Sequence, residues 1–133
     1  MAHLQSLVLE LGESTGAVHR ARERARDFLD HVPGPAPAAD TIRDVVMVVG
    51  ELVANAYRHA TGPRRLILAA DPETVTVAVE DGRPDGLTPL PVAPPSGGFG
   101  LLVIRRLSRV VDVHPLPGGK RVTAIIPRRP NSA

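Results

Sequence analysis

Residues 40–59 are predicted to form one long helix, and its pattern constrains the fold more than any other feature of the sequence. Apolar side chains recur along it at helical spacing and would form one buried face. These apolar positions are Ile42, Val45, Val46, Val49, Leu52, Val53, Ala56 and Ala60. Glu51, Asn55 and His59 recur every four positions, so they line a separate polar stripe. The helix therefore packs on a core while it presents an acid, an amide and an imidazole elsewhere.

The segments around this helix carry strand and helix patterns in turn. Adjacent strands joined by short turns favour a mixed, mainly antiparallel sheet with helices on one face, which is an α/β two-layer sandwich. The predicted order is a strand at 4–11, a helix at 18–32, the helix at 40–59, strands at 65–70 and 74–80, a loop at about 82–98, a helix that starts at the glycines before Leu101, and strands at 110–114 and 121–126.

Length and composition narrow the class of protein. The 133 residues fit one domain, spanning residues 1–133, with room for a single two-layer core. The 16 basic and 14 acidic residues give a formal charge of +2, which is too balanced to indicate direct nucleic-acid binding. Cysteine is absent, which excludes disulfides and thiolate metal sites. We expect a cytoplasmic protein without a membrane span.

The polar stripe of the long helix has chemistry suited to phosphate. Glu51 can act as a general base, and the amide oxygen of Asn55 is a hard ligand suited to a Mg²⁺ ion shared with phosphate. His59 could also reach a phosphate, and so could Arg58. Each residue has an ordinary alternative: Glu51 and Asn55 could lie on an exposed helix edge, while Arg58 and His59 could be capping or packing residues.

Two further signals lie on either side of the long loop. Asp81 ends an apolar strand, where its carboxylate can accept a hydrogen bond from an exocyclic amine such as that of adenine; with Gly82 it could instead form a turn. Gly98 and Gly100 precede a helix, where backbone N–H groups can approach an anion, although such glycines also serve as hinges. A loop as long as 82–98 is typical of a lid or a binding segment.

In their order and spacing, these segments resemble the motifs of the GHKL (Bergerat-fold) ATPases, and most closely those of the bacterial anti-sigma-factor serine/threonine kinases. Residues 51–59 (Glu-x-x-x-Asn-Ala-x-x-His) are similar to the N box, residues 79–82 (Val-Glu-Asp-Gly) to the start of the next box, and residues 98–101 (Gly-Phe-Gly-Leu) to the glycine box after the lid. The resemblance covers nearly the whole chain and implies the Bergerat ATP-binding fold, with ATP between the helices and the lid.

The resemblance also implies roles for the matching residues. On the long helix, Glu51 would be the base that activates the attacking hydroxyl and Asn55 would bind Mg²⁺. Arg58 stands where many relatives place a basic phosphate contact, and His59 ends the box.

Around the loop, Asp81 would read the adenine amino group, with Gly82 beside it. Gly98 and Gly100 would admit the phosphates of ATP, next to Leu101.

Three residues depart from the family's pattern. The family commonly continues Asp-x-Gly-x-Gly, whereas this chain has Arg83 and Asp85 in place of the later glycines. Many relatives also place a threonine beside the adenine, where Arg121 is expected to stand in this chain. Larger side chains near the base would weaken or reshape ATP binding.

The leading hypothesis is an ATP-binding anti-sigma factor or kinase that phosphorylates an antagonist protein. Its partners would be a sigma factor, an anti-anti-sigma protein of the STAS type, or both, with a homodimer as an open alternative. A second hypothesis is a non-enzymatic protein-binding module on the same fold, with weak or no ATP binding. A third is a structural dimerisation domain.

Overall fold

The computed structural model describes residues 5–12, 15–59, 63–82 and 99–129. The described chain forms five strands and three helices, in an order that agrees with the sequence prediction. The elements are β1 (Gln5–Glu10), α1 (Ala17–Asp30), α2 (Ala39–His59), β2 (Arg64–Ala70), β3 (Thr74–Gly82), α3 (Phe99–Leu107), β4 (Val110–Leu116) and β5 (Gly119–Pro127).

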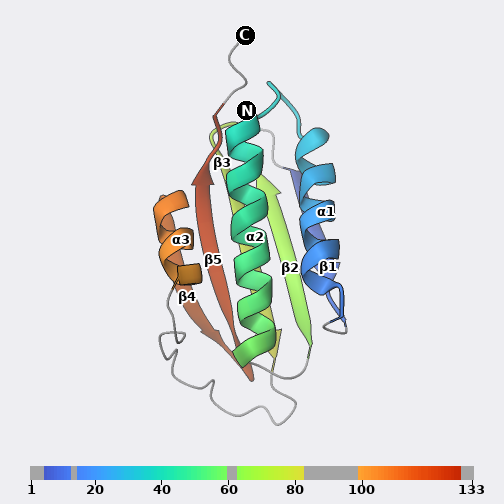
Figure 1. Cartoon of the computed structure of the whole chain (residues 1–133), viewed down its shortest axis with the longest axis vertical. Helices are drawn as coiled ribbons and strands as arrows, with labels where there is room; N and C mark the ends of the chain where they lie inside the picture. Colours follow the sequence, from blue (N-terminus) through green and yellow to red (C-terminus); the bar gives the residue numbers. More distant parts are fainter. Residues whose placement is uncertain (1–4, 13–14, 60–62, 83–98, 130–133) are drawn as a thin grey trace.

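The strands form one five-stranded sheet in the order β1-β2-β3-β5-β4. Each neighbouring pair is antiparallel, so the described sheet contains no parallel pair and the expectation of a mainly antiparallel sheet is confirmed. All three helices lie on one face, with α2 in the middle (Figure 1). The α/β two-layer sandwich expected from the sequence is therefore confirmed.

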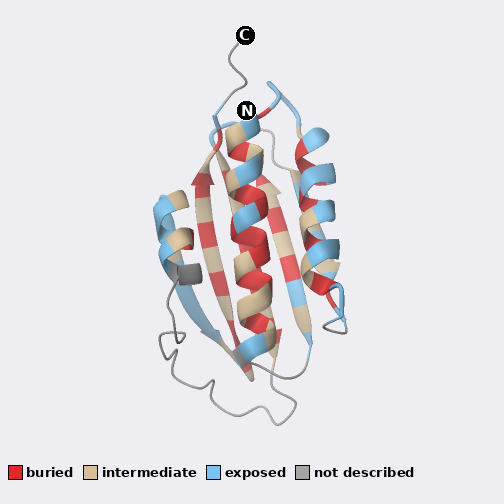
Figure 2. Ribbon diagram, viewed as in Figure 1, coloured by how far each residue is buried: buried red, intermediate tan, exposed pale blue. Residues whose placement is uncertain are grey.

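The core lies between the helices and the sheet. Alternate residues of β3 and β5 point into it, as the two-residue period of a strand requires. Val75, Val77 and Val79 of β3 are each at most 2% exposed, and the buried residues of α2 lie opposite them (Figure 2). Val48 of α2 is also fully buried although it is outside the predicted apolar face, because α1 and α3 flank α2 on both sides.

No described element covers the opposite face of the sheet. A row of alternating charges crosses it: the Nε atom of Arg65 lies 2.8 Å from Oε1 of Glu10, and the Nη1 atom of Arg65 lies 3.8 Å from Oε1 of Glu80. Arg121 continues the row by pairing with Glu80 from the other side. These exposed or half-buried ion pairs help to set the register of the strands, and they contribute little to stability.

None of the described helices is long and apolar enough to cross a membrane.

Candidate functional site

The motif residues come together at one end of the molecule. α2 and β3 both run towards this end, while α3 and β5 both begin there (Figure 1). α2 contacts β3, β5 and α3, so the chain ends of four elements meet around the last turns of α2. The sequence order alone places these motifs far apart, and only the antiparallel pairing of β3 with β5 brings their ends together.

Glu51 and Asn55 lie on consecutive turns of α2 and are both half-buried, whereas Arg58 is exposed. Half-burial leaves the carboxylate and the amide accessible to a ligand while the apolar face of the same helix fills the core. His59 is the last residue of α2, and its side chain lies outside the described part of the structure. The structure therefore brings Glu51 and Asn55 to the site as a pair and leaves the role of His59 a prediction.

Contacts from neighbouring segments fix the last turns of α2. The guanidinium of Arg64 lies 4.0 Å from the ring centroid of Tyr57, and its Nε donates a hydrogen bond of 3.3 Å to the carbonyl of Ala56. The hydroxyl of Tyr57 donates to the carbonyl of Gly12 at 2.6 Å. A cation beside the carbonyl end of a helix is favourable, because it offsets the partial negative charge there. Asn55 is thus held on a helix end that β2 and the β1–α1 connection secure.

Asp81 lies within β3 and is 7% exposed. The alternative that Asp81 and Gly82 form a turn is therefore wrong, because the strand continues through both residues and pairs them with Lys120 and Gly119. The N–H of Gly82 donates to the carbonyl of Pro63 at 2.8 Å, which ties the strand end to the α2–β2 connection. A buried carboxylate at a strand end is a specific acceptor for a polar ligand group.

The glycine box is described in part. Gly100 and Leu101 lie in the first turn of α3, a helix of nine residues that begins at Phe99. The first N–H groups of a helix have no partner within it and favour an anion. Residues 83–98 include Arg83, Asp85, Gly98 and most of the lid predicted at about 82–98, and they lie outside the described residues. The side chains at the start of α3 lie outside them as well.

Comparison with known proteins places this geometry in a family. The family model of the histidine kinase-like ATPase domain matches residues 13–126. The chain belongs to this family. The ATPase domain is thus expected to bind ATP, and the GHKL fold that the motifs imply is confirmed.

A solved structure gives the same fold. The crystal structure of the RsbU and RsbW domains of Rv1364c from Mycobacterium tuberculosis is similar to the ATPase domain, with a TM-score of 0.63 and 20% sequence identity. The match covers 97% of this chain but only 34% of that chain. No curated protein matches the sequence.

One expectation for the adenine end of the ATPase domain is wrong. Arg121 does not lie beside Asp81: it points to the uncovered face of the sheet, where its Nε donates to Glu80 at 2.7 Å. Lys120 points to the helices instead, and its Nζ donates to Oδ2 of Asp81 at 2.8 Å. The alternation of Lys120 with the apolar residues Val122, Ala124 and Ile126 was the signal in the sequence that could have identified it.

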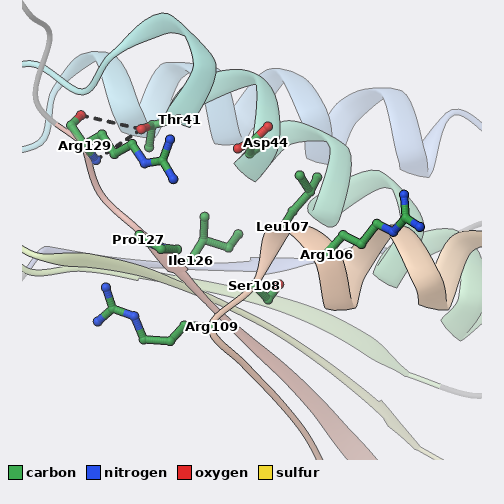
Figure 3. A pocket seen from close by; sticks show the side chains of 9 residues that line it. All are labelled: Thr41, Asp44, Arg106, Leu107, Ser108, Arg109, Ile126, Pro127 and Arg129. Carbon is green, nitrogen blue, oxygen red and sulfur yellow. Dashed lines mark hydrogen bonds between the residues drawn. The ribbon is translucent and has the colours of Figure 1, made fainter.

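One cavity of the ATPase domain, of about 310 Å³, lies away from these residues. It opens between the start of α2, the end of α3 and the end of β5 (Figure 3). Its arginines Arg106, Arg109 and Arg129 point in different directions, so they do not surround a common point. Thr41 in this cavity is 14 residues from Asn55, which is about 21 Å along a helix. The cavity is separate from the motif site.

Proposed function

We propose that the chain is an ATP-binding regulatory protein that acts as an anti-sigma factor and as a serine/threonine kinase towards an antagonist protein. The observation that supports it is the meeting of Glu51, Asn55, Asp81 and the start of α3 at one end of a histidine kinase-like ATPase domain. The RsbW domain in the similar solved structure and the resemblance to anti-sigma-factor kinases point to the same regulatory class.

Each residue has a part in the proposed reaction. Asp81 accepts a hydrogen bond from the adenine amine, and the N–H groups at the start of α3 hold phosphate oxygens. The half-buried amide oxygen of Asn55 suits Mg²⁺, which would neutralise charge on the phosphates. Glu51 takes the proton of the attacking hydroxyl as that oxygen forms a bond to the γ-phosphorus, and ADP leaves with the electrons of the broken bond. Arg58, at the surface, would contact phosphate.

The partners would be a sigma factor, a STAS-type anti-anti-sigma protein, or both, and the hydroxyl would belong to a serine or threonine of the latter. A homodimer is an open alternative to a monomer in this proposal. The phosphorylated group would then belong to the partner, because the described helices α1, α2 and α3 all pack on one face of the sheet.

Nucleotide binding is tested first, by following thermal unfolding during titration with ATP and Mg²⁺. A ligand at about 100 times its Kd should add about 2.7 kcal/mol to the free energy of unfolding. Asn55→Ala should remove the Mg²⁺-dependent part of this stabilisation. The matched control is Glu23→Gln on the exposed face of α1, which should leave it unchanged. Absence of any stabilisation of the wild-type chain would contradict the proposed function at its first step.

Phosphoryl transfer is tested next, with labelled ATP and the STAS-type protein that co-purifies from the native cell. Glu51→Gln should slow transfer by about 10²- to 10⁴-fold, because it removes the general base, while ATP affinity changes little. Equal transfer rates for Glu51→Gln and wild type would exclude Glu51 as the base.

The buried contact of Lys120 with Asp81 favours a second candidate, a protein-binding module with weak or no ATP binding. In this alternative the ammonium of Lys120 binds the carboxylate of Asp81, which is then not available to the adenine amine. The module would still capture its partner, and Asn55→Ala would leave that capture unchanged in the presence and absence of ATP.

A further inference from the structure

Lys120 is the only lysine in the chain, and it is buried. Its side chain is 11% exposed and that of Asp81 is 4% exposed, and their ion pair is 2.8 Å long. The other residues of β5 that point to the helices are apolar: Val122, Ala124 and Ile126. Burial of an ammonium is costly unless it is paired and hydrogen-bonded, so a lysine at this position among apolar residues needs a reason.

The backbone fixes where this pair lies. Asp81 and Lys120 are directly opposite each other in the β3–β5 ladder. A Cβ atom on the preceding Gly119 would lie 1.9 Å from the carbonyl oxygen of Asp81, so only glycine allows the two strands to come this close. The ammonium is therefore held beside the carboxylate at the end of the sheet where the motif residues meet.

The pair keeps hydrogen-bonding capacity on both sides. Lys120 binds Oδ2 of Asp81, and Oδ1 has no hydrogen-bonding partner among the described residues. An ammonium has three donors, of which one is used by Asp81. The wall of the site thus presents an acceptor beside a donor. The Watson–Crick edge of adenine is the complement of this pattern, because its amino group donates and the adjacent N1 accepts.

We propose that Lys120 is a base-reading residue: Asp81 accepts a hydrogen bond from the adenine amino group through Oδ1 while the ammonium of Lys120 donates to N1. The proposal rests on the proposed function, since it requires ATP to bind at this end of the sheet. In the same position guanine would set its O6 against the carboxylate and its N1–H against the ammonium, so Lys120 selects adenine over guanine.

Deleting the acceptor atom from the ligand tests this without altering the protein. The analogue is 1-deaza-ATP, in which C–H replaces N1, and Kd is measured by calorimetry on the full chain. Loss of a charge-assisted hydrogen bond in a buried site should weaken binding at least about tenfold relative to ATP. GTP should bind more weakly than ATP as well. Equal Kd values for ATP and 1-deaza-ATP, or tighter binding of GTP, would overturn the proposal.

Variants of Lys120 complete a double-mutant cycle, in which N1 of the ligand and the side chain of Lys120 are removed separately and together. Lys120→Met should weaken ATP binding, and it should abolish the difference between ATP and 1-deaza-ATP because the donor is gone. Tighter ATP binding by this variant would mean that the ammonium competes with adenine, and would overturn the proposal. If Lys120→Met fails to fold, Lys120→Arg is used instead. It keeps the positive charge and the hydrogen-bond donors, so it should retain the preference for ATP. The matched control is Arg121→Met on the opposite face, which should change none of these ratios.

The single lysine also provides a direct signal. Selective ¹⁵N-lysine labelling gives one side-chain ammonium resonance, and saturating ATP should shift it more than saturating 1-deaza-ATP does. Equal shifts would count against a bond from Lys120 to N1. If ATP fails to bind the wild-type chain at all, the proposed function fails together with this inference. If ATP and 1-deaza-ATP bind with equal Kd values, the proposed function stands and only the role of Lys120 is wrong.

Discussion

The guanidinium of Arg128 connects three segments that are distant in the sequence. It donates to the carbonyl of Asp71 at 2.8 Å, to that of Pro33 at 2.6 Å and to that of Pro35 at 2.9 Å. Arg128 is itself only 8% exposed, so its guanidinium depends on these carbonyls more than on water for its hydrogen bonds. One residue therefore joins the α1–α2 connection and the β2–β3 turn to the end of β5.

Arg128→Met should destabilise the chain by about 3 kcal/mol, because it removes three hydrogen bonds that a charged group donates. The measurement is the free energy of unfolding from urea denaturation. Arg129→Met is the control, since Arg129 is exposed and its backbone, rather than its side chain, bonds to Thr41. A similar small effect of both substitutions would contradict this role for Arg128.

The carboxylate of Asp71 caps the β2–β3 turn. Its Oδ1 accepts hydrogen bonds of 2.7 Å from the N–H groups of Glu73 and Thr74, and these bonds lower the pKa of Asp71 below its ordinary value of 3.8. A lowered pKa in the folded state means that the contribution of Asp71 to stability is present above pH 3.8 and is lost as the pH falls through the folded-state pKa.

Asp71→Ala should therefore reduce the free energy of unfolding at pH 7, and the gap to wild type should narrow as the solution is acidified below about pH 4. Asp112→Ala on β4 controls for the removal of one exposed negative charge. A gap that stays constant down to pH 2 would show that the charge of Asp71 contributes nothing to the turn.

At the scale of elements, the β3–β5 pairing sets the geometry of the site. Periodicity in the sequence predicts these strands, because a half-buried strand must alternate. It does not predict how far they continue. Asp81 and Gly82 have the composition of a turn, but pairing with β5 keeps them in the strand. The expected position of Arg121 beside the adenine is wrong for a related reason: a shift of one residue moves a strand side chain to the opposite face.

Gly119→Ala should test how tightly these two strands are held. The new Cβ would lie 1.9 Å from the carbonyl oxygen of Asp81, so β3 and β5 must separate there, and we expect a loss of stability of about 2 to 3 kcal/mol. Gly12→Ala is the matched control. Gly12 has a positive φ of +66°, but no atom of another segment lies within 4 Å of its new Cβ, so only about 1 kcal/mol of backbone strain is expected.

For the molecule as a whole, one buried core extends through α1, α2, α3 and the three strands β2, β3 and β5. The long helix and its apolar face could be predicted because local spacing determines them. Burial of Val48 could not, since it depends on α1 and α3 lying on both sides of α2. The same holds for the site: the types of its residues are visible in the sequence, but the convergence of four element ends depends on the order of strands in the sheet.

A shared core predicts a single cooperative unfolding transition. The midpoint from far-ultraviolet circular dichroism should coincide with that from calorimetry, and the calorimetric and van't Hoff enthalpies should agree. Two separated transitions would indicate that the chain is not one domain.

The contact of Tyr57 with Arg64 and Gly12 has a practical consequence. The chain has one tyrosine and no tryptophan, so its intrinsic fluorescence comes from a single ring, and that ring lies two residues from Asn55 on the last turns of α2. Emission from this phenol depends on its hydroxyl bond and on the guanidinium over its face. The unmodified protein thus carries its own optical reporter next to the site, and binding can be followed in solution without any dye.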